Sequence, residues 1–277
     1  MALVAYAPGK DFPAVSVTGK SCALDCAHCS GRYLAGMEPA TSPEGLWAFA
    51  SGLAARGGTG LLLSGGCDAA GHVPLEPFIE LIPRICRELG LRVNVHVGVS
   101  GEDFLDALAS AIPDAVSVDV VGDDDVVKDV FGLGSGAEAY WSTYEGLLAR
   151  GLNAVPHLTV GLKGGKDSGE EAAIKRLATL KPKRLVINFL VPTKGTRYEA
   201  AAFDRARALE IVRLAREKLP AAFIVLGCMR PRGSGDFEAE AVGLGVDGVV
   251  NPPRKAVAGW ESSGKVVVWR RTCCALD

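Results

Sequence analysis

The sequence lacks the features of membrane, secreted and nucleic-acid-binding proteins. It contains no uninterrupted run of about 18 apolar residues, the length that a membrane-spanning helix needs, and it does not begin with a charged leader followed by an apolar stretch and a cleavage site. It also has no basic tail or run of Lys and Arg, and its formal net charge is −2. We therefore expect a cytoplasmic protein whose principal partner is neither a membrane nor a nucleic acid.

The chain is also poor in charge. Among its 277 residues 22% are charged and 48% are hydrophobic, which is enough apolar content for one large core. Short β-branched runs alternate with amphipathic stretches, a pattern typical of a parallel sheet wrapped by helices. We predict one α/β domain over residues 1–277, a (β/α)8 barrel of the TIM type, with residues 252–277 as a C-terminal extension that closes over the barrel mouth.

Eight strands are predicted, and each is followed by a loop that can carry functional groups. Helices fill the gaps, the first with Ser42 as its N-cap and Pro43 at its first position. In a parallel barrel the site is expected at the carboxyl ends of the strands. The predicted strands are 13–19, 60–64, 91–98, 114–121, 154–161, 184–190, 222–227 and 246–250, and the later helices are 77–89, 102–111, 138–150, 169–180, 200–218 and 237–244.

Three cysteines follow the first predicted strand with an uncommon spacing. Cys22, Cys26 and Cys29 form a C-x3-C-x2-C motif. A zinc site normally has four protein ligands or a reactive water, whereas a [4Fe-4S] cluster held by three cysteines leaves one iron open for a small molecule. The motif therefore favours an open cluster, with a zinc knuckle or three incidental thiols as the alternatives.

This spacing resembles the signature of the radical SAM superfamily. The resemblance implies that the open iron of the [4Fe-4S] cluster chelates S-adenosylmethionine, which the cluster cleaves to a 5′-deoxyadenosyl radical with an electron from a donor such as ferredoxin. In that family the residue before the last cysteine is commonly aromatic and packs on the adenine. Here it is His28, a departure whose ring can still stack.

A second motif, Ser-Gly-Gly-Cys-Asp, follows the second predicted strand. Paired glycines allow the backbone to approach a ligand closely, and the carboxylate of Asp68 can accept a hydrogen bond from an ammonium group. The motif is similar to the Gly-Gly-Glu motif of radical SAM enzymes, with Cys67 and Asp68 in place of the usual acid. The resemblance implies that Gly65, Gly66 and Asp68 hold the methionine end of the cofactor, and an ordinary turn is the alternative.

Four residues of later strands are also assigned to the cofactor by this resemblance. Asp119 would lie near the ribose, and Thr159 and Gly161 near the adenine, although Thr159 fits an ordinary barrel strand equally well. Asn188 begins a segment that looks like the Asn-x-Leu-x-Pro-x-x-Gly-Thr motif of biotin synthase and its relatives. This residue would bind cofactor or substrate from inside the barrel.

Five further cysteines lie outside the motif. In a reducing compartment they remain thiols unless they bind metal, and Cys86 has the position of a small hydrophobic residue in a helix. The other four suggest an auxiliary Fe-S cluster opposite the first. The alternative is that Cys67 replaces a turn residue, that Cys228 is buried, and that the terminal pair is disordered or modified. These candidate ligands are Cys67, Cys228, Cys273 and Cys274.

The phrases Phe-Pro-Ala-Val-Ser-Val-Thr-Gly, Ser-Gly-Gly-Cys-Asp and Gly-Cys-Met-Arg-Pro-Arg-Gly look like those of biotin-synthase-related proteins of archaea and some anaerobic bacteria. That group resembles a two-component lipoyl synthase, although the chain lacks the N-terminal C-x4-C-x5-C motif of the common bacterial enzyme. The resemblance implies sulfur insertion into the octanoyl chain of a carrier protein or lipoyl domain, together with a paralogous radical SAM subunit. The alternatives are a radical SAM mutase or cofactor-assembly enzyme, and a non-enzymatic Fe-S carrier.

Overall fold

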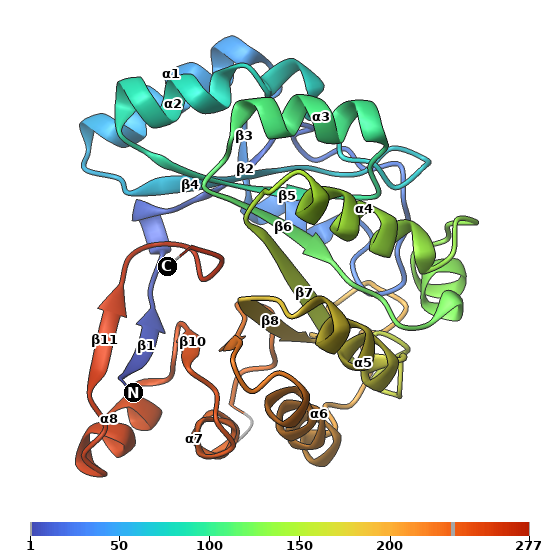
Figure 1. The fold of residues 1–277 in the computed structure, drawn as a ribbon, viewed down its shortest axis with the longest axis vertical. Helices are drawn as coiled ribbons and strands as arrows, with labels where there is room; N and C mark the ends of the chain where they lie inside the picture. Colours follow the sequence, from blue (N-terminus) through green and yellow to red (C-terminus); the bar gives the residue numbers. More distant parts are fainter. Residues whose placement is uncertain (1, 234–235, 277) are drawn as a thin grey trace.

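The computed structural model describes residues 2–233 and 236–276. These residues form an 11-stranded sheet in which every paired strand is parallel. The sheet curls with the helices on its outer face (Figure 1), so the predicted α/β barrel architecture is confirmed. Seven helices match the prediction and one more, α8 (Arg254–Ser262), follows them. The matching helices are α1 (Pro43–Ala55), α2 (Leu81–Leu89), α3 (Glu102–Ala111), α4 (Glu138–Ala149), α5 (Glu170–Leu180), α6 (Arg205–Lys218) and α7 (Phe237–Gly243).

All eight predicted strands are present, and three short strands were missed. The strand order along the sheet is β11-β1-β10-β9-β8-β7-β6-β5-β4-β2-β3, so β11 and β3 are its two edges. The missed strands are β1 (Leu3–Tyr6), β3 (Glu38–Pro39) and β11 (Val267–Arg270). The predicted strands are β2 (Ala14–Ser16), β4 (Gly60–Ser64), β5 (Arg92–Val97), β6 (Ala115–Asp119), β7 (Ala154–Val160), β8 (Arg184–Phe189), β9 (Phe223–Leu226) and β10 (Gly248–Val250).

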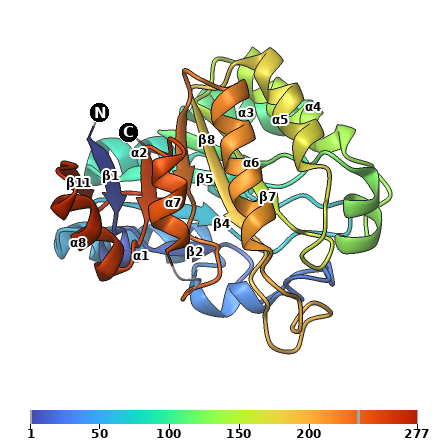
Figure 2. The same cartoon turned by 90° about the horizontal axis from the view of Figure 1, so that it is seen from below.

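The helices begin and pack as their sequences dictate. The hydroxyl of Ser42 accepts a hydrogen bond from the backbone N–H of Gly45 (3.1 Å), a side-chain cap with Pro43 at the first helical position of α1; such a cap contributes about 1 kcal/mol. Leu46 and Leu53 on the same helix are fully buried against the sheet. Figure 2 shows α6 and α7 over the strands from another side. In the part of the chain that the structure describes, no helix has the length and apolar content needed to cross a bilayer.

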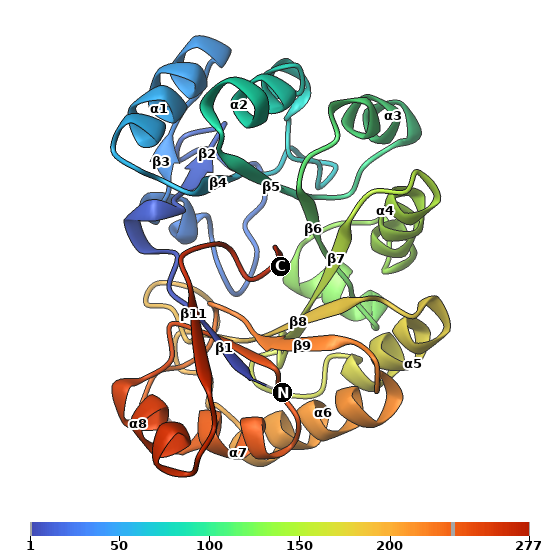
Figure 3. The same ribbon diagram turned by 60° about the vertical axis from the view of Figure 1, so that its left-hand side comes forward.

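The C-terminal segment occupies the interior of the barrel near the amino ends of the strands. Figure 3 shows it turning inward from β11. The hydroxyl of Thr59, just before β4, donates to the carbonyl of Arg271 (2.9 Å), and Arg184, the first residue of β8, donates to the carbonyl of Cys274 (3.0 Å). Leu276 is fully buried. This placement corrects the expectation that the segment closes over the mouth, which lies at the carboxyl ends. The residues packed around it are Tyr6, Phe12, Ala115, Val155, Val186, Val225 and Val250.

Candidate functional site

A cavity of about 290 Å³ lies at the carboxyl ends of the central strands, the edge where barrel sites form. Much of its lining comes from the loop after β2, here called the cysteine loop (residues 17–31), and the loop after β4, the glycine loop (residues 65–72). Most of the remaining lining is apolar. The predicted site residues that line this cavity are Cys22, Cys26, His28, Cys29, Gly65, Gly66, Cys67, Asp119 and Thr159.

Hydrogen bonds hold the cysteine loop in place on two sides. The hydroxyl of Thr18 donates to the carbonyl of Ser21 (2.8 Å) and accepts from the backbone N–H of Gly66 (2.7 Å). The N–H of Ala27 donates to the carbonyl of Val130 (2.7 Å), in the segment after β6. The loop is therefore fixed against the segments that follow β4 and β6 before any ligand is bound.

The thiols of this loop fit an iron–sulfur cluster better than a single metal ion. Cys22, Cys26 and Cys29 are free, partly buried and line one cavity. Across residues 2–233 and 236–276, no three His, Cys, Asp or Glu side chains gather closely enough for one ion. A [4Fe-4S] cluster is larger, and its cysteines bind different irons, so the thiolates surround the site. Burial, then Cys29 and Cys22, raise the pKa of Cys26 to about 12 in the metal-free chain; iron supplies the positive charge that a thiolate needs there.

His28 presents an aromatic surface to the same cavity. Its ring lies 5.7 Å from the Phe131 ring and 6.2 Å from the Tyr33 ring, measured between centroids. Burial lowers its pKa to about 4, so the imidazole is neutral. Its Nδ1 atom is buried and has no hydrogen-bond partner among the described residues. An unpartnered ring nitrogen beside a cavity fits a hydrogen bond to a bound ligand, and the stacking of His28 on adenine stays a prediction.

The glycine loop packs directly on the cysteine loop. The N–H of Cys67 donates to Sγ of Cys22 (3.3 Å), and the N–H of Ala23 donates to the carbonyl of Cys67 (2.7 Å). A Cβ atom on Gly66 would overlap the carbonyl oxygen of Ser21 and lie 2.7 Å from Cβ of Cys22. Only glycine fits here without moving the first motif cysteine.

Asp68 has a different environment from the rest of the glycine loop. One carboxylate oxygen, Oδ1, accepts hydrogen bonds from the backbone N–H groups of Ala70 (2.8 Å) and His72 (3.0 Å). The residue does not belong to the cavity lining described above. The side chain therefore closes a turn, which was the alternative interpretation, and its assignment to the methionine amino group stays a prediction.

The part of the cavity lined by β5, β6 and β7 is polar. Two histidines in it, His96 and His157, were not predicted. Nε2 of His96 lies 3.6 Å from Oδ2 of Asp119, and the His96 and His157 rings are 5.3 Å apart. Burial opposes both charges of the pair, yet their interaction raises the pKa of His96 and lowers that of Asp119. Burial and then His96 lower the pKa of His157 to about 4. His96 and Asp119 thus form an ion pair when His96 is protonated, beside the neutral imidazole of His157.

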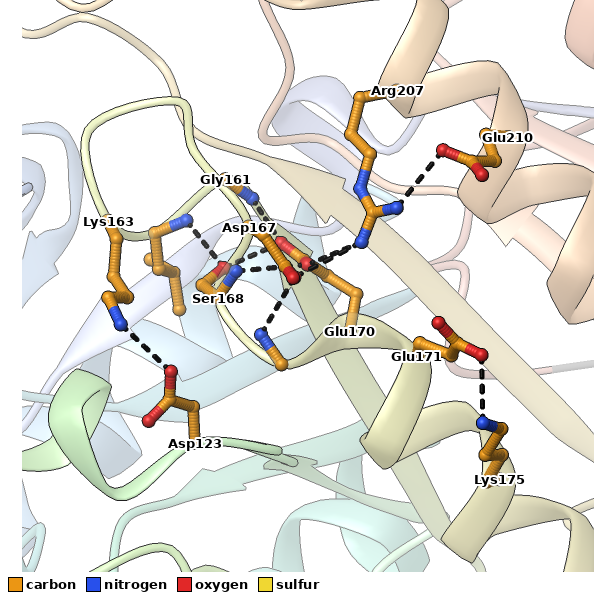
Figure 4. Close-up of polar contacts among 12 residues, drawn as sticks. Asp123, Gly161, Lys163, Asp167, Ser168, Glu170, Glu171, Lys175, Arg207 and Glu210 are labelled. Carbon is orange, nitrogen blue, oxygen red and sulfur yellow. Dashed lines mark hydrogen bonds and ion pairs between the residues drawn. The ribbon is translucent and has the colours of Figure 1, made fainter.

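The loop after β7 is fixed by a buried carboxylate (Figure 4). Glu170 accepts hydrogen bonds from the N–H of Gly161 (2.7 Å) and the hydroxyl of Ser168 (2.6 Å), and Nη2 of Arg207 lies 3.5 Å from it. The Ser168 hydroxyl also accepts from the N–H of Leu162 (3.0 Å), whose side chain lines the cavity. Gly161, at a φ of +80°, makes this turn possible. Gly161 lies outside the cavity lining, and its predicted contact with adenine stays a prediction.

Asn188 supports the loop that carries Cys228. Its side-chain oxygen accepts a hydrogen bond from the N–H of Met229 (3.4 Å), and a Cβ atom on Gly227 would overlap the same oxygen. Asn188 is 8% exposed and lies outside the cavity lining. Its predicted contact with cofactor or substrate stays a prediction, and the contact seen is a positioning one.

The remaining cysteines divide into two groups, in contrast to the single ligand set expected. Cys67 lies with Cys22 on the mouth side. Cys228, which follows β9, is an exposed residue, and the protein atoms around its thiol, followed by Cys273, raise its pKa. The Cys273 sulfur accepts a hydrogen bond from Nδ2 of Asn94 (3.4 Å). A hydrogen bond from Cys274 lowers the pKa of Cys273 to about 7, and the same bond raises that of Cys274.

The comparison with family models decides the chemistry of the motif cysteines. The model described as the Radical SAM superfamily matches residues 16–177, which contain both the cysteine and the glycine loops. The chain belongs to the radical SAM superfamily. Membership confirms the predicted family and implies a [4Fe-4S] cluster and S-adenosylmethionine for this radical SAM enzyme.

The chain is similar to a curated biotin synthase and to several solved structures. The biotin synthase of Wolinella succinogenes is 28% identical over 244 residues, which are 85% of each chain. Methylornithine synthase (PylB) superposes with a TM-score of 0.65 at 15% identity, over 98% of this chain and 84% of that one. HydG, a maturase of the [FeFe]-hydrogenase, gives a TM-score of 0.65 at 15% identity, and the chain covers 57% of its length. Both structures share the fold.

We expect Gly66→Ala to weaken binding of S-adenosylmethionine by this radical SAM enzyme. The added methyl group must displace Ser21 or Cys22, and with them the cluster against which the cofactor binds. The measurement is the dissociation constant of the cofactor together with the iron content after anaerobic reconstitution. Gly259→Ala is the matched control, because a Cβ atom there meets nothing within 4 Å. Unchanged affinity and iron content in Gly66→Ala would remove the glycine loop from the cofactor site.

Proposed function

We propose that this radical SAM enzyme inserts sulfur and is one component of a two-protein lipoyl synthase acting on a protein-bound octanoyl chain. The observation that carries the proposal is a second group of thiols, Cys228, Cys273 and Cys274, which lie close together: after burial, the charge of Cys273 raises the pKa of Cys228, and Cys228 contributes to the raised pKa of Cys274. A carbon radical formed at the cavity would need a sulfur source nearby. The similarity to the Wolinella biotin synthase supports sulfur chemistry of this kind.

The residues of the cavity have separable roles in this reaction. When bound, the cluster and S-adenosylmethionine supply a 5′-deoxyadenosyl radical, which removes a hydrogen atom from an aliphatic carbon. Cys22, Cys26 and Cys29 would hold the cluster, and Gly66 would let the cofactor approach it. The apolar side chains of the lining would exclude water and accept an alkyl chain. These side chains include Leu24, Leu34, Met37, Val73, Val121, Phe131 and Leu162.

The sulfur would come from sulfide held by the second group of thiols. Cys273 is suited to bind iron, because the hydrogen bonds from Cys274 and Asn94 favour its thiolate. Cys228 approaches it from the end of β9, on the loop that Asn188 supports. We propose Cys228, Cys273 and Cys274 as candidate ligands of an auxiliary cluster. Cys67 is left out of this set, because it lies with Cys22.

The reaction sets the partners that the enzyme would need. The octanoyl chain would be presented by a carrier protein or lipoyl domain, and a ferredoxin-like donor would supply the electron. A paralogous radical SAM subunit would act together with this chain to insert the two sulfurs. Addition of each purified component to an anaerobic assay, with the thiolated octanoyl product measured by mass spectrometry, tests this requirement directly.

We expect the double variant Cys228→Ala/Cys273→Ala to lose about one cluster's share of iron and sulfide, since Fe-S clusters are normally held by cysteinyl thiolates. It should no longer thiolate an octanoylated carrier, yet should still form 5′-deoxyadenosine at the first cluster. Cys86→Ala is the control, because Cys86 lies on α2 with its thiol directed to Asp114 (3.6 Å). Full iron content and continued thiolation in the double variant would overturn the auxiliary cluster.

A second function is favoured by the polar floor of the cavity. The ion pair of His96 with Asp119 and the neutral His157 suit a substrate with polar groups, as a carbon-skeleton mutase or a cofactor-assembly enzyme would use. Such an enzyme needs no second cluster. Iron and sulfide equal to one [4Fe-4S] cluster per chain, with turnover of a polar substrate, would support it in place of sulfur insertion. A non-enzymatic Fe-S carrier would not cleave S-adenosylmethionine at all.

A further inference from the structure

We infer that Cys67 is a fourth, exchangeable ligand of the first cluster, which binds the open iron while S-adenosylmethionine is absent and leaves it when the cofactor binds. The inference rests on the family's cluster and not on the proposed sulfur insertion. The motif cysteines account for three irons, and the structure places one further thiol in the cavity that they line.

The position of Cys67 is fixed by contacts on both sides of the residue. Its N–H donates to Sγ of Cys22, its carbonyl accepts from the N–H of Ala23, and the preceding Gly66 packs against Cβ of Cys22. On the other side, the carboxylate of Asp68 closes the turn that follows. The backbone of Cys67 is therefore held beside the cluster loop without any ligand.

Cys67 belongs to this cavity by position. It lines the cavity together with Cys22, Cys26 and Asp119. The structure gives its sulfur no hydrogen bond among the described residues, whereas the thiol of Cys86 donates to a carboxylate oxygen of Asp114. Cys228 lies near Cys273 instead. A thiol with this placement and no other partner is available to iron.

The exchange balances without a redox step. In the absence of cofactor the Cys67 thiol loses its proton to water and an Fe–S bond forms, which completes the four-cysteine ligation usual for [4Fe-4S] clusters. On cofactor binding, that Fe–S bond breaks, the amino and carboxylate groups of S-adenosylmethionine take its place, and the thiolate takes up a proton. No electron is transferred. The Cys67 thiolate thus occupies the fourth iron whenever no cofactor is present.

Cys67→Ala should bind S-adenosylmethionine more tightly than the wild type. When Cys67 occupies the open iron about nine-tenths of the time, only about one-tenth of the protein can bind the cofactor. Removal of the thiol therefore lowers the apparent dissociation constant about tenfold. The full-length, anaerobically reconstituted protein is titrated with the cofactor, and binding is followed by the change in the electron paramagnetic resonance signal of the reduced cluster. Cys67→Ser, which keeps the side-chain size, is measured beside it.

Mössbauer spectra of the same ⁵⁷Fe-loaded samples provide the second readout. Without cofactor, the wild type and Cys86→Ala should agree with each other and differ from both Cys67 variants; with saturating cofactor, all four should agree. Identical cofactor-free spectra and equal dissociation constants in the wild type and the Cys67 variants would overturn the inference. Loss of a whole cluster's iron in Cys67→Ala would also overturn it, because Cys67 would then hold a second cluster.

Discussion

Replacing Cys22, Cys26 and Cys29 together by Ala is expected to abolish formation of 5′-deoxyadenosine. The three thiols line one cavity and are the donor set that we predict for the [4Fe-4S] cluster of this radical SAM enzyme. Without thiolates no cluster can pass an electron to S-adenosylmethionine. The product is measured by chromatography after dithionite reduction of the anaerobic protein.

The control for this variant is Cys86→Ala, which removes a thiol from α2 outside the cavity. It should form 5′-deoxyadenosine at the rate of the wild type. An auxiliary cluster, where present, should survive in the triple variant and give the remaining iron. Undiminished 5′-deoxyadenosine in the triple variant would show that these cysteines do not hold the catalytic cluster.

Glu238→Ala is expected to lower the free energy of unfolding by about 3–5 kcal/mol, because it leaves a buried charge without its partner. Nε of Arg230 lies 3.1 Å from Oε1 of Glu238, and the two side chains are 0% and 5% exposed. Arg230 also donates to the carbonyls of Gly227 (2.7 Å) and Asn251 (3.2 Å), so it joins β9, β10 and α7 behind the Cys228 loop. Chemical denaturation followed by circular dichroism measures the change.

Lys255→Ala is the matched control for Glu238→Ala. Nζ of Lys255 lies 3.2 Å from Asp236, in an ion pair whose side chains are 87% and 64% exposed. Exposed pairs contribute only about 0–1 kcal/mol, so this variant should unfold close to the wild type. An equal decrease in the free energy of unfolding in the two variants would show that burial does not strengthen the contribution of the Arg230–Glu238 pair.

The strands and the cysteine loop could be predicted because their signals are local. Val and Leu runs such as Gly60–Ser64 mark strands within a few residues, and three cysteines within eight positions mark a metal site at any strand end. β1 (Leu3–Tyr6) was missed, because four apolar residues form a strand only when distant partners such as Val249 lie beside them. The placement of Leu276 inside the barrel likewise depends on residues far away in the sequence.

The polar part of the site was harder to predict for a related reason. His96, Asp119 and His157 are single polar residues on three different strands, and only the register of the sheet brings them together. A signal was present, since Asn94 and His96 alternate with valines on β5 and thus face one side. For Asp68 no sequence signal could decide, because the same carboxylate can close a turn or bind an ammonium group.

The pairing of β1 with the last strands of the chain has a consequence for the rate of folding. Val4 pairs with Gly248 and with Val268, so neither ladder can form until nearly the whole described chain has been gathered. Contacts between such distant residues close large loops, which slows folding. Until then β1, β10 and β11 present unpaired edges, and edges of this kind promote association between incompletely folded chains. The yield of native protein after dilution from denaturant should thus fall as the protein concentration rises. It should also depend on how fast the four residues Leu3–Tyr6 pair with β10 and β11.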